Sequence, residues 1–242
     1  MKAMILAAGF GERLRPLTET TPKPLLQVGG KPLIQYHIEN LAAAGVREIV
    51  VNTSWLGEMI EAYLGDGSRF GVEIFWSREE APLETGGGIR RALPYLGCEP
   101  FLVVNGDVWT DYPLETLIER EWSREMDAHL VLIPNPPFKS VGDFSLSNGL
   151  VSYPQNGEKS YTFSGISVMC PEMFALHPSA SEKFPLRNVL EASVRAHSVS
   201  GEVFDGTWWD VGTLDRLEML NTLLAGKPLD IAKKPRLRPQ IA

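Results

Sequence analysis

The chain has 242 residues and a net charge of −7, with 23 lysines and arginines against 30 aspartates and glutamates. This balance excludes a broad electrostatic attraction to nucleic acid or to an anionic membrane, so we expect neither as a partner. No apolar run approaches the roughly 20 residues that cross a bilayer. The chain begins in a strand pattern without a signal peptide, which predicts a cytoplasmic protein. Cys98 and Cys170 have no metal-type spacing and are expected to be buried free thiols.

Strand and helix patterns alternate through the first half of the chain. Strands are predicted at residues 3–8, 48–52, 72–76 and 101–104, with helices between them at 33–44, 56–64 and 88–96. This alternation implies right-handed crossovers and a mostly parallel sheet flanked by helices. Ligands of such α/β sheets bind at the carboxyl ends of the strands, where the loop at 9–11 and the turn at 105–107 lie.

The second half of the chain has a different pattern. A helix is predicted at 114–122, strands at 128–133 and 161–169, and helices at 186–196 and 211–224. Between them, residues 134–160 are rich in Pro, Gly, Asn and Ser and predict inserted hairpins that cover a substrate. We expect one domain over residues 1–225, followed by a flexible tail at 226–242.

Glycines and cations follow the first predicted strand. Gly9 and Gly11 allow backbone N–H groups to approach phosphate oxygens without a Cβ in the way. Arg13 offers a planar fork that matches phosphate oxygens, and Lys23 lies between two prolines that restrict its backbone. These residues together predict a polyphosphate site.

The glycine spacing by itself is weak, because the third glycine of a dinucleotide fingerprint would fall at Leu14 and no Gly-Lys-Ser/Thr follows. The whole pattern AAGxGxRxxPxT, followed by PKPL, is specific and resembles the signature of the sugar-1-phosphate nucleotidylyltransferases. Members of that family transfer a nucleoside monophosphate from an NTP to a sugar 1-phosphate. The resemblance spans residues 1–224. It implies a Rossmann-like nucleotidyltransferase fold, with a nucleotide-binding core at 1–112 and a sugar-binding and C-terminal part at 113–225.

The resemblance also implies roles for individual residues. Arg13, Lys23 and Asp107 are expected to be catalytic: Arg13 holds the leaving pyrophosphate, Lys23 neutralises charge at the α-phosphate and the sugar phosphate, and Asp107 holds the metal ion. The expected nucleotide contacts are Ala8, Gly9, Gly11, Glu12, Arg13, Lys23, Thr85 and Gly86. The expected sugar contacts are Asn105, Gly142, Asp143 and Gly165.

Two carboxylates are candidate metal ligands. Asp107 follows a buried apolar run and a glycine, which suits an Mg²⁺ ion that bridges phosphate oxygens, although Asn-Gly-Asp is also a common turn. Asp210 precedes a predicted helix and could equally be a capping residue. The resemblance implies that this pair ligates the catalytic Mg²⁺. A sugar phosphate oxygen is already an anion, so the reaction needs no general base, and catalysis is positioning plus charge stabilisation.

Four segments favour one branch of the family. Residues 83–88 (LETGGG), 105–111 (NGDVWTD), 142–144 (GDF) and 162–165 (TFSG) look most like the branch that couples UTP to N-acetylmuramic acid 1-phosphate in bacterial cell-wall sugar recycling. Ala81 stands where thymidylyltransferases that act on glucose 1-phosphate carry Gln. Lys159 lacks the following proline of the family's Glu-Lys-Pro segment, so we assign it no role.

Three alternatives stay open at this point. The first is a mannose-1-phosphate guanylyltransferase. The second is an inactive nucleotide-sugar-binding regulatory protein, which the joint presence of Arg13, Lys23, Asp107 and Asp210 disfavours. The third is a nicotinamide dehydrogenase, which Leu14 disfavours. We expect a monomer or a small homo-oligomer.

Overall fold

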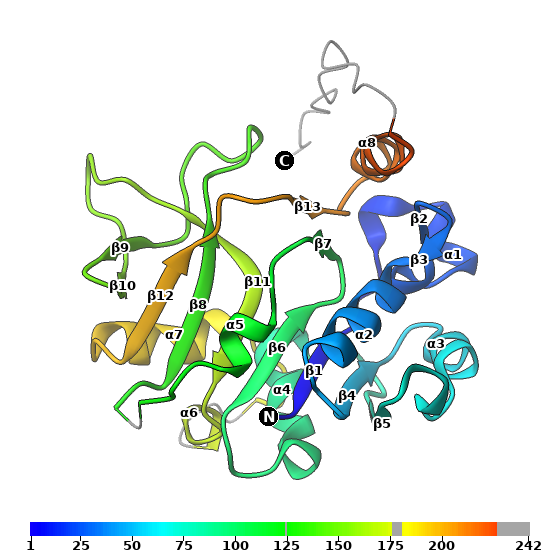
Figure 1. Ribbon diagram of the computed structural model, residues 1–242, viewed down its shortest axis with the longest axis horizontal. Helices are drawn as coiled ribbons and strands as arrows, with labels where there is room; N and C mark the ends of the chain where they lie inside the picture. Colours follow the sequence, from blue (N-terminus) through cyan, green and yellow to red (C-terminus); the bar gives the residue numbers. More distant parts are fainter. Residues whose placement is uncertain (124, 176–180, 227–242) are drawn as a thin grey trace.

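A nine-stranded sheet runs through the molecule in the computed structural model, which describes residues 1–123, 125–175 and 181–226 (Figure 1). The strand order is β5-β4-β1-β6-β11-β8-β12-β10-β9. The bounds are β1 Ala3–Leu6, β4 Glu48–Thr53, β5 Glu73–Arg78, β6 Phe101–Asn105, β8 Ala128–Ile133, β9 Ser145–Ser147, β10 Leu150–Ser152, β11 Thr162–Met169 and β12 Val199–Val203. The β5-β4-β1-β6 half is parallel, while β11 runs antiparallel to both β6 and β8. The predicted α/β architecture, a sheet flanked by helices, is confirmed.

Helices cover both faces of the sheet because successive strand residues point to opposite sides. In β1, Ile5 faces a core formed with α2 (Leu33–Ala43) and α3 (Gly57–Leu64). Met4 faces a second core formed with α4 (Glu84–Leu96) and α7 (Leu186–Arg195). The remaining helices are α1 Leu17–Thr20, α5 Glu115–Ile118, α6 Glu172–Ala175 and α8 Leu214–Leu224, with 3₁₀ turns at Glu12–Leu14, Lys23–Leu25 and Ser68–Phe70. The predicted flexible tail, from residue 227 onward, lies outside the described residues.

A two-stranded ribbon was not predicted from the sequence. It pairs β7 (Val108–Thr110) with β13 (Trp208–Asp210), with Val108 opposite Asp210. A short hairpin of β2 (Gln27–Val28) and β3 (Lys31–Pro32), and strand β12, were also unpredicted. Each strand is two to five residues long, too short for a clear period-2 pattern.

The glycine run at 86–88 lies inside α4, which begins at Glu84 rather than at the predicted residue 88. A Cβ on Gly86 would come within 2.5 Å of the Phe184 ring, and one on Gly88 within 2.8 Å of Glu79 Oε1. A Cβ on Gly87 would overlap the Glu182 carbonyl oxygen. The run therefore allows close packing of the first turn of α4 and is not the flexible loop that glycine content suggests.

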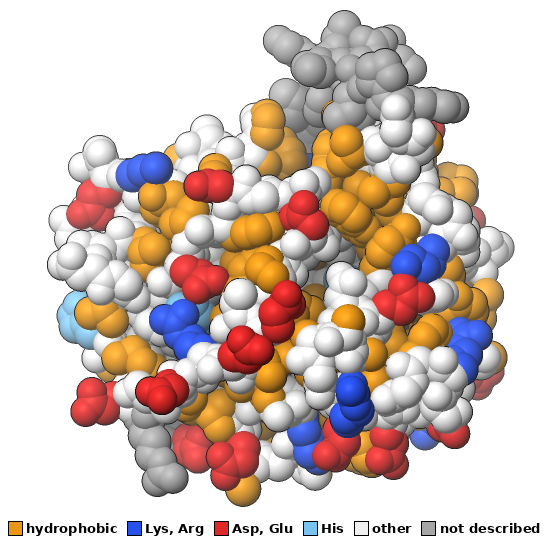
Figure 2. Space-filling model, viewed as in Figure 1, with side chains coloured by type: hydrophobic (Ala, Val, Ile, Leu, Met, Phe, Trp, Pro, Cys, Tyr) orange, Lys and Arg blue, Asp and Glu red, His pale blue; other side chains and the backbone are white. Residues whose placement is uncertain are grey.

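No helix among the described residues is both long and apolar enough to cross a membrane. Figure 2 shows acidic and basic side chains interspersed over the visible face. Both cysteines are free, but the prediction of two buried thiols is wrong for Cys98, which is exposed at the end of α4. Cys170 is half-buried and accepts a hydrogen bond from Trp122 Nε1 at 3.2 Å.

A buried polar cluster joins β8 to β12. The His129 side chain is fully buried; its Nδ1 lies 2.8 Å from Ser200 Oγ and its Nε2 lies 3.4 Å from Glu202 Oε2. The Tyr112 hydroxyl donates a hydrogen bond to Glu202 Oε1. Arg120 Nη1 donates to Glu202 Oε2 at 3.2 Å. The hydrogen bond with His129 lowers the pKa of Glu202 to about 2; burial opposes this, and the hydrogen bond with Tyr112 adds to it.

Replacing Glu202 with Gln should lower the free energy of unfolding by about 1 kcal/mol at pH 7, the usual scale for a partly exposed charged hydrogen bond. The pKa of Glu202 in the folded protein lies below its ordinary value of 4.5. The contribution of the Glu202 carboxylate to the free energy of unfolding is therefore complete above pH 4.5 and is lost as the pH falls toward 2. Urea unfolding at pH 7 and pH 3 would show the difference between wild type and variant shrinking at the lower pH. The control is Glu191→Gln on the exposed face of α7, with little expected change. An equal difference at both pH values would contradict the assignment.

Candidate active site

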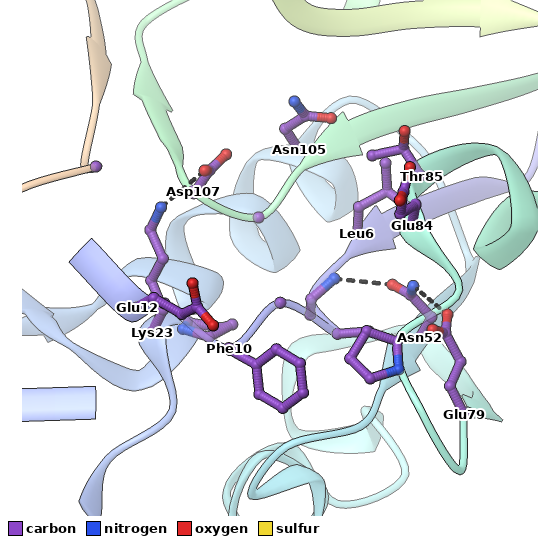
Figure 3. A pocket seen from close by; sticks show the side chains of 18 of the residues that line it. Leu6, Phe10, Glu12, Lys23, Asn52, Glu79, Glu84, Thr85, Asn105 and Asp107 are labelled. Atoms are coloured by element: carbon purple, nitrogen blue, oxygen red, sulfur yellow. Dashed lines mark hydrogen bonds and ion pairs between the residues drawn. The ribbon is translucent and has the colours of Figure 1, made fainter. Parts of the chain in front are cut away.

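A cavity of about 690 Å³ opens at the carboxyl ends of β1, β4 and β6, where the sequence predicted ligand binding. It brings together nine of the predicted site residues: Ala8, Gly9, Gly11, Glu12, Arg13, Lys23, Thr85, Asn105 and Asp107. In Figure 3, Glu12, Lys23 and Asp107 lie on one side, and Asn52, Glu79, Glu84 and Thr85 lie on the other. We call the end with Lys23 and Arg13 the cationic end after these two side chains, which are accompanied there by Glu12 and Asp107; the other end carries Glu79 and Glu84.

The loop after β1 is shaped by Gly11, which has a φ of +65°. A Cβ there would come within 2.8 Å of Thr18 Cγ2, and the Thr18 hydroxyl donates to the Gly11 carbonyl oxygen at 2.9 Å. Any larger residue at position 11 would meet both backbone strain and a collision. Gly9 has open space around its Cα, which leaves room for an approaching group.

Lys23 and Asp107 form an ion pair at the cationic end, with 2.7 Å between Nζ and Oδ2. The Lys23 side chain is only 11% exposed, held by the 3₁₀ turn that its neighbouring prolines begin. Burial by itself would raise the pKa of the Asp107 carboxyl, but the charge and hydrogen bond of Lys23, with a smaller effect of Arg13, hold it below its ordinary value. Burial lowers the pKa of nearby His37 to about 4, so this imidazole is neutral at pH 7.

Asp210 lies beside the cavity on the β7–β13 ribbon and is not itself among the residues that line it. The ribbon continues with a hydrogen bond from the Val211 amide to the Asp107 carbonyl oxygen at 2.9 Å. Asp210 Oδ2 accepts a hydrogen bond from Arg216 Nη1 at 2.5 Å. Its Oδ1 is buried and has no partner among the described residues. A Cβ on Gly212 would lie 2.7 Å from that oxygen and 3.1 Å from Arg13 Nη2, so Asp210 and Arg13 both lie against Gly212.

Arg216 was missed by the sequence analysis. Its guanidinium pairs with Asp210 and stacks on the ring of Phe138, 3.7 Å from the ring centroid. Arg216 therefore joins α8 to the loop after β8, on the side of the inserted hairpins. Nothing in the local sequence distinguishes it from an arginine on a solvated helix face.

Thr85 and Gly86 lie at the start of α4 with different surroundings. Thr85 lines the cavity, and its Oγ1 accepts a hydrogen bond from the Leu186 amide at 2.9 Å. Gly86 is buried against Phe184 and does not line the cavity. The 181–186 segment is thereby held over the first turn of α4, and it carries Lys183 to the cavity wall, another residue that the sequence analysis missed.

The predicted sugar contacts lie in two places. Asn105 lines the cavity, and a Cβ on Gly165 would come within 2.7 Å of its side-chain amide. Asp143 Oδ2 accepts hydrogen bonds from Lys139 Nζ at 2.6 Å and from the Phe163 amide at 2.9 Å. Gly142 packs directly on the backbone of Tyr161, where any Cβ would collide. Gly142, Asp143 and Gly165 are not among the residues that line the main cavity.

Comparison with known proteins identifies the class. The model of the nucleotidyl transferase family matches residues 2–226, so this chain belongs to that family, as the sequence signature predicted. An N-acetylmuramate alpha-1-phosphate uridylyltransferase from Neisseria meningitidis serogroup B is 51% identical over 227 residues, which cover 92% of this chain and 98% of that protein. A protein of the same name from Caulobacter vibrioides is 37% identical, covering 87% of this chain and 91% of its own length.

Two further similarities are more distant. A mannose-1-phosphate guanyltransferase from Yarrowia lipolytica is 35% identical, but the match covers only 61% of that protein. A solved structure from Bacillus anthracis, assigned as a glucose-1-phosphate thymidylyltransferase and in complex with sucrose, superposes with a TM-score of 0.82. The match covers 93% of this chain and 95% of that one at 24% identity, which supports the fold alone.

Proposed function

We propose that this protein transfers UMP from UTP to a sugar 1-phosphate, with N-acetylmuramic acid 1-phosphate as the preferred acceptor, and releases pyrophosphate. The observation that carries this proposal is the 51% identity to a uridylyltransferase over nearly the full length of both chains. The cavity supports this proposal because it has a lysine and an arginine at one end. A nucleoside triphosphate carries phosphates that pair with cations at one end, and an uncharged base at the other. The guanyltransferase alternative has lower identity and much lower coverage of the relative.

In this proposal the chain acts by positioning and by charge stabilisation. Arg13 and the amides of the loop after β1 hold the β- and γ-phosphates. Lys23 stabilises negative charge that develops at the α-phosphate while the sugar phosphate oxygen attacks in line. Asn105 and the neighbouring Gly165 lie against the sugar, with Gly142 and Asp143 as outlying contacts.

Asp107 and Asp210 would hold a divalent cation, which we propose to be Mg²⁺. Both offer carboxylate oxygens, the donors that this hard cation prefers, and the buried Oδ1 of Asp210 has no other described partner. The described residues hold no cluster of three or more His, Cys, Asp or Glu side chains able to bind a metal, so phosphate oxygens and water would supply the other ligands. When bound, the cation neutralises charge on the phosphates and fixes their geometry. Cytoplasmic location and oligomeric state stay predictions from the sequence.

The test is a pyrophosphate-release assay of four NTPs against N-acetylmuramic acid, mannose and glucose 1-phosphates. UTP should exceed GTP and ATP in kcat/KM by at least about 10²-fold, the scale of a lost buried polar pairing. N-acetylmuramic acid 1-phosphate should be the preferred acceptor. A preference for GTP with mannose 1-phosphate would overturn the substrate assignment and favour the guanylyltransferase alternative.

A further inference from the structure

A buried carboxylate at the end of the cavity far from Lys23 has no place in the mechanism above. Glu79 is 5% exposed, and each of its two oxygens accepts one hydrogen bond. Asn52 Nδ2 donates to Oε1 at 2.7 Å, and the Leu83 amide donates to Oε2 at 2.8 Å. The Asn52 Oδ1 in turn accepts from the Ala7 amide at 2.8 Å, so one chain of hydrogen bonds runs from Ala7 to Leu83. Figure 3 shows its central link, between Asn52 and Glu79.

This chain of hydrogen bonds joins three segments that are far apart in the sequence and meet at the cavity. Ala7 follows β1, Asn52 lies at the end of β4, and Leu83 precedes the first turn of α4. A buried charge is tolerated only where its hydrogen bonds are satisfied. Asn52 Nδ2 and the Leu83 amide therefore fix the position of the Glu79 carboxylate, and the carboxylate in turn fixes the positions of Asn52 and Leu83. Gly88 leaves the necessary space, since a Cβ there would lie 2.8 Å from Glu79 Oε1 and 2.9 Å from Asn52 Nδ2.

The backbone next to Leu83 is strained. Glu84 has a φ of +60°, although it is not glycine, and it lines the cavity. A non-glycine side chain is sterically disfavoured in this region and persists there only where its surroundings hold it. The hydrogen bond from the Leu83 amide to Glu79 is one such restraint, directly before the strained residue.

Charge identifies what this end of the cavity takes. Glu79 and Glu84 outnumber Lys183, the one cation of the described lining on this wall, whereas Arg13 and Lys23 equal Glu12 and Asp107 in number at the other end, where Gly9 and Gly11 also let phosphates approach the backbone. Phosphates are therefore favoured at the end of Arg13 and Lys23. A nucleotide whose phosphates lie at the cationic end places its base between the chain after β1 and the start of α4. Both walls are the segments that Glu79 and Asn52 tie together.

We infer that Glu79, with Asn52, is a positioning residue of the base subsite: the pair sets the distance between the chain after β1 and the start of α4, and thereby the discrimination between nucleobases. This inference rests on the proposed function for the identity of the base. Glu79 touches no reacting atom. Its effect should therefore appear in nucleotide binding and base selectivity, and not in the acceptor or the chemical step.

The experiment compares Glu79→Gln and Asn52→Ala with wild type in steady-state assays that vary UTP, GTP and the sugar 1-phosphate separately. Glu79→Gln retains the shape of the side chain but turns one acceptor into a donor, which faces another donor. Both variants should raise the KM for UTP by about tenfold and lower the ratio of UTP to GTP kcat/KM by about tenfold, the scale of one lost buried hydrogen bond. The KM for the sugar 1-phosphate and kcat at saturation should stay within about twofold of wild type.

Glu202→Gln is the matched control, since it also alters a hydrogen-bonded glutamate but lies outside the cavity. It should lower stability without changing the KM for UTP or the ratio between bases. If Asn52→Ala fails to fold, the milder Glu79→Gln carries the test. A folded Glu79→Gln variant with wild-type KM for UTP and wild-type base ratio would overturn the inference and leave the proposed function intact. If the wild type prefers another NTP, the proposed function fails, and the KM for that NTP becomes the readout.

Discussion

Asp107→Asn should lower kcat by at least about 10²-fold, the scale seen when charge in a transition state loses a partner. Asp107 lies just after β6, and its carboxylate is one of the two that we propose to hold the cation between the phosphates. Asparagine keeps the size of the side chain but removes its charge. Asp210→Asn should have an effect of the same scale. Kinetics under saturating UTP and sugar 1-phosphate, with Mg²⁺ titrated in each variant, measure both the loss of turnover and any weakening of metal activation.

Two controls separate the metal from the fold. A chelator should abolish wild-type activity and added Mg²⁺ should restore it. Asp127→Asn removes a carboxylate charge away from the cavity, where Asp127 accepts from Ser198 at 2.6 Å, and it should leave kcat unchanged. Near-normal turnover in Asp107→Asn or Asp210→Asn would remove that residue from the proposed metal site.

Lys23→Ala should depress kcat more than it raises the KM for UTP, with a loss of at least about 10²-fold in kcat. The reason is that Lys23 is expected to act where negative charge builds up in the transition state. The variant also leaves the Asp107 carboxylate without the partner that lies 2.7 Å away, which adds repulsion toward the phosphates. A double-mutant cycle of Lys23→Ala with Asp107→Asn should be strongly non-additive, because each residue is the other's ion-pair partner.

The matched control for Lys23 is Lys31→Ala, which breaks an ion pair with Glu39 on the surface of α2. Exposed pairs of this kind contribute little, so kinetics should stay at wild-type values. Unchanged kcat in Lys23→Ala would mean that the loop after β1 and the turn at 23–25 are structural, and the proposed mechanism would lose its main cation.

Much of the nucleotide end of the site could be predicted from the sequence, because the residues that form it are close together in the sequence. The strand of β1, the glycines after it, Arg13 and the Pro-Lys-Pro turn lie within 24 residues of the N-terminus, and their chemistry follows from residue type and spacing. The parallel half of the sheet was predictable for a similar reason, since strand and helix periodicities alternate clearly there. Both the architecture and the family membership were confirmed.

Other parts of the site depend on contacts between distant segments, which leave no local pattern. Pairing of β7 with β13 brings Asp210 to Asp107 from about a hundred residues away, and neither strand is long enough to show a period. Arg216 pairs with Asp210 only six residues away, but its stacking on Phe138 joins segments far apart in the sequence. The predicted helix began only at residue 88 because glycine content cannot reveal that Phe184, Glu182 and Glu79 crowd the first turn of a helix at 84–88.

The same distinction applies to Asn52 and Glu79. Asn52 lies near the end of a buried strand and Glu79 follows a partly buried one, positions where a polar residue is ordinary. Nothing in either stretch of sequence shows that the two side chains meet. Residue type and spacing thus identify the family and the chemistry of the phosphate end, since backbone conformation and charge act over a few residues. The second carboxylate, its arginine and the hydrogen bonds that shape the far end of the cavity follow only from folding, because burial and long-range packing determine which polar groups must pair.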